Sequence, residues 1–137
     1  LAIIGVSSCK NNTENESQEP ENEHVHADEA IELNDGEKWL VDSNMMVFIR
    51  GMEADIDSFK GGEIEQYSTL AKNLESNLDL LTSNCTMKGK AHDELHKWLL
   101  PYIDQIDHFL ECDDLEESKN HFEEIQNSFK TFNQYFK

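Results

Sequence analysis

Apolar residues recur at intervals of three and four along most of this chain, which is the spacing of helices that bury one face. Four such stretches follow one another between residues 34 and 137, and none shows the alternation of a strand. The buried positions that we predict are Met45, Ile49, Met52, Ile56 and Phe59 in the first, Ile64, Tyr67, Ala71, Leu74, Leu78 and Leu81 in the second, Leu99, Ile103, Ile106 and Leu110 in the third, and Leu115, Phe122, Ile125, Phe129, Phe132 and Phe136 in the fourth.

Capping residues and helix breakers predict where these helices begin and end. The first should begin near Asn34 and end before Gly61-Gly62, and the second should end at Ser83-Asn84. The third should run from about residue 91 to 111, and the fourth should open at Asp113-Asp114. Since short connections make neighbouring helices antiparallel, the sequence predicts an all-α fold, an up-down-up-down four-helix bundle.

The residues ahead of this bundle have a different composition. Residues 10–33 are rich in Asn, Glu, Ser and Gln and hold almost no apolar side chains. Such a stretch buries too little surface to offset the entropy of ordering, so we expect a disordered acidic linker. His24 and His26 lie within it, and a pair of this kind binds metal weakly or has no role.

The first nine residues form a separate segment. A short apolar run, far too short to span a bilayer, ends in Val6-Ser7-Ser8-Cys9. This ending resembles a bacterial lipobox, in which small residues precede a lipidated cysteine. The resemblance implies that residues 1–9 close a lipoprotein signal peptide and that Cys9 carries a lipid anchor. The protein would then be held on a membrane of a bacterial cell envelope, facing the periplasm or the exterior. A chance Ser-Ser-Cys is the alternative.

The charge of the chain narrows the choice of partners. The formal net charge is −18, with 29 acidic residues against 11 Lys and Arg. A surface of this sign repels phosphate backbones, so we expect no nucleic-acid binding, and it disfavours direct contact with anionic lipid surfaces. It also raises the local concentration of cations, which suits metal binding.

The candidate chemistry is concentrated between Cys85 and His96, where one thiol, the thioether of Met87 and two imidazoles lie within twelve residues. His92 and His96 are four apart, so on a helix they share one face. That face continues into the apolar seam of the third helix, where burying an imidazole is unfavourable unless it finds a partner. A metal ion is one partner that would satisfy both.

The bundle topology predicts which other residues join this pair, because the first and third helices point the same way. Their N-terminal ends should gather Trp39, Asp42, Met45 and Met46 with Cys85, Met87, His92 and His96. Thioether, thiolate and imidazole are ligands that favour copper. We therefore predict a copper site formed by Cys85, Met87, His92, His96 and Met45.

Three alternatives remain open from the sequence. Zinc would take the two histidines and Cys85 with Asp42 as a carboxylate ligand. A b-type haem would use Met45 with either histidine as its axial pair. In the third alternative the histidines hydrogen-bond Asp42 or a backbone carbonyl, and the methionines only fill the core.

The cysteines and acidic residues of the third helix carry further expectations. Cys85 and Cys112 bracket about 25 residues of helix, more than about 30 Å at ~1.5 Å per residue, so a disulfide within the chain is not feasible. Glu94 and Lys97 are expected on the solvated face of this helix. Since no complete catalytic arrangement can be named, we do not expect an enzyme.

The sequence therefore predicts a membrane-anchored lipoprotein whose bundle acts in metal binding, delivery or electron transfer. A haem-binding bundle or a ligand-free interaction module would be the alternatives. The motif Cys-Thr-Met-Lys-Gly-x-Ala-His-x-x-Leu-His, which begins at Cys85, resembles one in small uncharacterised bacterial lipoproteins. That resemblance implies no particular activity.

Overall fold

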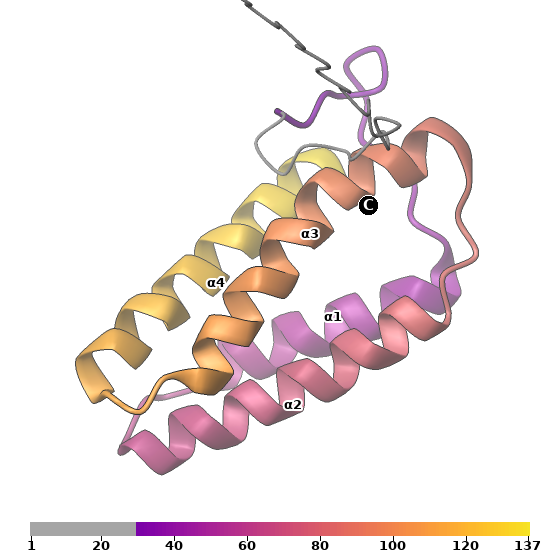
Figure 1. Ribbon diagram of the computed structural model, residues 1–137. Coiled ribbons are helices and arrows are strands. Elements are labelled where there is room, and N and C mark those ends of the chain that lie inside the picture. Colours follow the sequence, from indigo (N-terminus) through magenta and orange to yellow (C-terminus); the bar gives the residue numbers. More distant parts are fainter. Residues whose placement is uncertain (1–29) are drawn as a thin grey trace, which may run out of the picture.

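The computed structural model describes residues 30–137, and these form an up-down bundle of four helices, as predicted (Figure 1). The predictions about Cys9, His24 and His26 lie outside the described residues. Within residues 30–137, none of the helices is long and apolar enough to cross a membrane. The helices are α1 (Ser43–Ser58), α2 (Ile64–Ser83), α3 (Gly89–Glu111) and α4 (Leu115–Tyr135).

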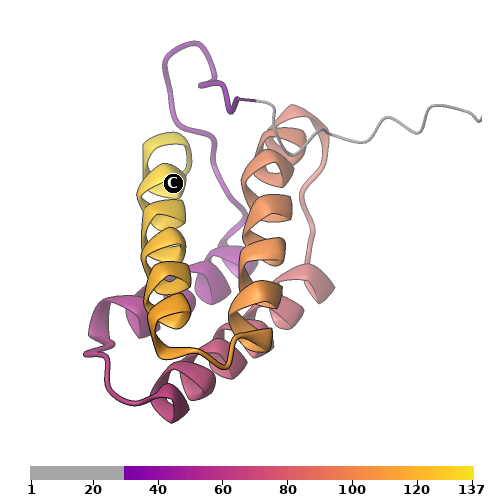
Figure 2. The ribbon, with the colours of Figure 1, turned by 60° about the vertical axis from the view of Figure 1, so that its left-hand side comes forward.

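The four helices are arranged as two hairpins. α1 packs along α2 and α3 packs along α4, while α2 and α3 make the main contact between the hairpins. Figures 1 and 2 show the hairpins lying across one another and diverging towards the end where residues 84–88 connect α2 to α3. This divergence matters for the site, because the predicted ligands lie at that end.

The predicted apolar seams form one continuous core. Ile49 and Met52 of α1 and Leu74 of α2 are completely buried, as are Ile106 of α3 and Phe132 of α4. An aromatic cluster joins the last two helices; it consists of Trp98, Tyr102, Phe129, Phe132 and Phe136. The period of the sequence therefore identified the buried faces of α1, α2 and α4. In α3 it was partly wrong, because Ile103 and Leu110 are only half-buried and the buried face is centred on Leu95, Trp98, Tyr102, Ile106 and Phe109.

The predicted start of the first helix near Asn34 was wrong. Asn34 and Glu37 instead exchange two backbone hydrogen bonds of 2.9 Å around a tight turn. Asp35 and Gly36 fill its two central positions with φ of 50° and 85°. An Asp-Gly pair adopts these left-handed angles more readily than most, so it favours a turn here over a helix start. The helix begins only at Ser43.

Residues 30–42, which we call the N-terminal strap, belong to the folded body, although residues 30–33 had been expected in the linker. Trp39 had been placed on the first helix, but it lies in the strap. Its backbone pairs with the C-terminus of the chain, because Trp39 N donates to Tyr135 O at 2.8 Å and Lys137 N donates to Trp39 O at 2.9 Å. The indole is only 7% exposed, and its Nε1 donates to Glu32 O at 2.6 Å.

The other helix ends agree with the capping residues. α4 follows Asp114, whose side chain accepts a hydrogen bond from Glu117 N at 2.9 Å, so the predicted N-terminus is confirmed. α2 ends at Ser83, also as predicted. α3 starts at Gly89, two residues earlier than expected, and this places His92 within its first turns.

Candidate metal centre

Four of the five predicted ligands line one cavity at the divergent end of the bundle. We call it the bundle-end cavity; its volume is about 340 Å³. It lies between the start of α1, the end of α2 and the N-terminal half of α3. Its lining consists of Met45, Leu81, Thr82, Cys85, His92, Leu95, His96, Leu99, Leu100 and Ile103. The N-terminal ends of α1 and α3 therefore both contribute to this cavity, as the bundle topology predicted.

The histidine pair stands at this cavity from successive turns of α3. The ring centroids of His92 and His96 are 4.1 Å apart, with an angle of 59° between the planes, and both residues are half-buried. Within residues 30–137, no hydrogen bond of the protein engages either imidazole. The alternative in which Asp42 or a backbone carbonyl satisfies them is therefore not what the structure shows.

Burial favours the neutral form of His96. It lowers the pKa of His96 from its ordinary value of 6.5, and the charge of His92 lowers it further, while Asp93 opposes both. Two imidazoles this close cannot both be protonated without repulsion. The neutral form is the one that binds metals, so the local environment favours the ligand form of His96 near neutral pH.

The three sulfur-bearing residues differ in position. Met45 is 1% exposed and reaches the cavity from α1, and Cys85 is exposed on the connection between α2 and α3. Met87 is buried in the core and does not line the cavity. The arrangement therefore offers the thioether of Met45, rather than that of Met87, beside the two histidines.

Asp42, which the zinc alternative uses as a carboxylate ligand, does not line the cavity. It is exposed at the N-terminus of α1, and its Oδ2 accepts a hydrogen bond from Thr86 Oγ1 at 2.6 Å. The amide of Asn44 donates to Asn84 O at 2.9 Å. These bonds hold the connection that carries Cys85 against the start of α1. The sequence did not predict these bonds, because nothing around Thr86 indicates a partner 44 residues away.

The number of ligands limits which metal fits. In the part of the chain that the structure describes, no three His, Cys, Asp or Glu side chains are grouped closely enough to hold a metal ion. Structural zinc sites use four such ligands and catalytic sites use three. What lines the cavity is two imidazoles, one thioether and a thiol on a surface connection. These side chains are of the soft and imidazole types that copper accepts, but they are not grouped as a formed metal site.

Glu94 lies between the two histidines in sequence and was expected in solvent, but it is 3% exposed. Its Oε2 accepts a hydrogen bond from Glu32 N in the strap, and its Oε1 accepts one from Lys97 Nζ, both at 2.9 Å. Glu94 therefore fastens the N-terminal strap to the helix that carries the histidines. The sequence gives no sign of this role, because the partner is 62 residues away.

The remaining cysteine has a structural contact. Cys85 and Cys112 are both free, and the 23 residues of α3 lie between them. The sulfur of Cys112 accepts a hydrogen bond from Ser118 Oγ at 3.4 Å. Ser118 is 1% exposed, so Cys112 satisfies a buried hydroxyl at the start of α4.

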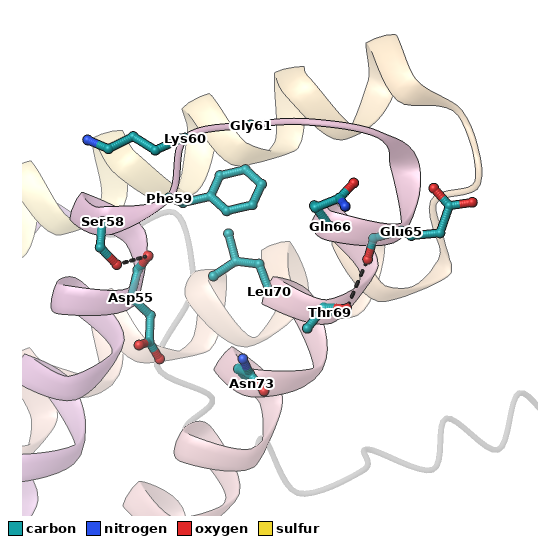
Figure 3. Close-up of a pocket in the computed structure, with 10 residues that line it drawn as sticks. All are labelled: Asp55, Ser58, Phe59, Lys60, Gly61, Glu65, Gln66, Thr69, Leu70 and Asn73. Atoms are coloured by element: carbon teal, nitrogen blue, oxygen red, sulfur yellow. Dashed lines mark hydrogen bonds between the residues drawn. The ribbon is translucent and has the colours of Figure 1, made fainter.

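A second hollow lies at the opposite end of the α1–α2 hairpin. It is an open groove of about 430 Å³ with a polar rim that includes Asp55, Lys60 and Glu65 (Figure 3). Its hydrogen bonds are local ones, from Ser58 Oγ to Asp55 O and from Thr69 Oγ1 to Glu65 O. None of the predicted ligands lines this groove, so the candidate chemistry stays with the bundle-end cavity.

Comparisons of this chain with protein-family models, with curated proteins and with solved structures found no match. A bundle of four helices hosts many unrelated functions, so the fold alone assigns none. Function has to be inferred from the residues at the bundle-end cavity.

Proposed function

We propose that the protein binds one Cu(I) ion at the bundle-end cavity, with His92, His96 and Met45 as ligands. The observation that supports this is that side chains from α1 and α3, and Cys85 from the connection before α3, line the same cavity. A core with no ligand would not need two half-buried histidines on an apolar seam that, among residues 30–137, take part in no hydrogen bond of the protein. Copper gives both imidazoles a partner.

The donor set supports the choice of metal and oxidation state. Thioethers are soft ligands that select Cu(I), and imidazole accepts copper in either state. The lowered pKa of His96 keeps its ring neutral, so protons compete less with the ion. Met45 is almost fully buried, which holds its sulfur in place. Cys85 is exposed, so its thiol is positioned to pass an ion to or from a partner.

We further propose that this copper chemistry takes place at a bacterial envelope membrane, on the basis of the lipobox-like Val6-Ser7-Ser8-Cys9. Protein made in a lipoprotein-processing host should then partition with the membrane fraction, and Cys9→Ser should move it to the soluble fraction. Equal partition of the two forms would contradict a lipid anchor at Cys9.

Competition between the protein and a coloured Cu(I) chelator under reducing conditions tests the copper site. Wild-type protein should withdraw one equivalent of Cu(I), and His92→Ala and His96→Ala should each weaken the affinity by at least about tenfold. His108→Ala is the matched control, because this exposed histidine lies on α3 away from the cavity. If the wild type and His96→Ala withdraw equal amounts of copper, the proposal is wrong.

A further inference from the structure

We infer that the bundle-end cavity also admits a compact, neutral, apolar molecule beside the histidine pair. This inference goes beyond copper binding and does not depend on it, because it rests on the part of the cavity that a metal ion would leave empty. The expected ligand class is a small hydrocarbon or single-ring aromatic molecule without charge.

The lining of the cavity has a part with polar side chains and a larger aliphatic part. On α3 the two histidines come first, and the residues that follow along the cavity are Leu99, Leu100 and Ile103. Leu81 of α2 and Leu95 of α3 are fully buried and complete the aliphatic wall with Met45. The polar contribution comes from Thr82, Cys85, His92 and His96. A molecule in this space would touch aliphatic side chains over most of its surface.

The size of the cavity decides what kind of molecule fits. An enclosed cavity of about 150 Å³ lined by Leu, Ile and Phe stays dry and binds benzene. The bundle-end cavity has about 340 Å³, which is more than one metal ion occupies, and it is partly open to solvent, since Leu100 and Ile103 are only half-buried and Cys85 is exposed. It is at the lower end of the range of about 300–1,000 Å³ for small-molecule sites. A single-ring molecule fits this space better than a macrocycle such as haem.

Water is a poor occupant of the aliphatic part. An ordered water needs two to four polar partners, and Leu95, Leu99 and Leu100 side chains offer none. An empty space leaves those side chains without dispersion contacts on one side. An apolar molecule restores these contacts without burying an unpaired polar group. An organic ion would find neither a counter-charge nor metal-type ligands in the aliphatic part of the lining.

Titration of the full-length, metal-free protein with toluene tests the inference, with methyl NMR of labelled Leu and Ile as the readout. Saturable shifts are expected at methyl groups of the cavity wall, with one molecule bound. Leu100→Phe fills the space and should weaken binding by at least about tenfold. Leu110→Phe is the matched control, since Leu110 is equally half-buried on α3 but does not line the cavity.

Further experiments distinguish an apolar site from a charged one and from the copper site. Benzoate keeps the ring but adds a charge, and it should not bind. Ile103→Phe is a second filling variant that replaces Leu100→Phe if the latter does not fold. His96→Ala should keep toluene binding while it loses copper, so failure of the copper site and failure of the apolar site give different results. Absence of saturable shifts in the wild type, or equal binding by the filled and control variants, would overturn the inference.

Discussion

Replacing Trp39 with alanine should lower the free energy of unfolding by about 3–5 kcal/mol, the loss typical of a large buried aromatic side chain. The indole is 7% exposed, and it donates a hydrogen bond to Glu32 O that alanine cannot make. Its backbone also pairs with the last residues of the chain. Trp39 thus joins the N-terminal strap, the C-terminus and the core. Alanine keeps the backbone pairing, so the expected loss comes from the packing and the hydrogen bond of the indole.

Urea unfolding followed by circular dichroism measures this effect. Leu40→Ala is the matched control, because the neighbouring leucine is 70% exposed and its loss should change the free energy of unfolding by no more than about 0.5 kcal/mol. Equal effects of the two substitutions would mean that the strap does not pack on the bundle in solution.

Cu(I) should raise the free energy of unfolding of the wild type by roughly 2.7 kcal/mol when it is present at about one hundred times its dissociation constant. This holds if the ion binds the folded form alone, because the ligands come from separate segments that only folding brings together. His96→Ala should abolish most of this gain. The metal-free variant should remain folded, since alanine is a good helix former and no protein hydrogen bond to His96 is lost within the described residues.

Thermal melting with and without copper, under reducing conditions that keep Cys85 free, provides the measurement. His108→Ala should respond to copper as the wild type does. A wild-type melting curve that copper leaves unchanged would contradict the site, and so would a His96→Ala protein that gains as much stability as the wild type.

The features that the sequence predicted correctly depend on residues that are close together in the chain. The buried faces of the helices follow from the spacing of residues such as Ile49, Leu74 and Phe129, and that spacing is independent of the partner against which they pack. The Asp114 cap is local in the same way. Asn34 was misread because the Asp-Gly pair that follows it has a strong preference for a turn, and this preference decides over a helix start.

What the sequence did not predict depends on contacts between distant residues. Glu94 looks like a solvated residue until the strap covers it, and the exposed Asp42 accepts a hydrogen bond from Thr86, which is 44 residues away. At the site, too, some placements were predicted and others were not. The topology correctly brought Met45 to the histidines, but the spacing of Cys85 and Met87 could not reveal that only Cys85 would line the cavity.

X-ray absorption at the copper edge of the Cu(I)-loaded protein tests the central claim most directly, because it reports the atoms bound to the ion. We predict that imidazole nitrogen and sulfur atoms are bound directly to copper in the wild type. Cys85→Ser should keep the sulfur contribution, and Met45→Leu should lose it or reduce it sharply. A first shell without sulfur in the wild type, or one that is unchanged when both His92 and His96 are replaced by alanine, would contradict a copper site at the bundle-end cavity.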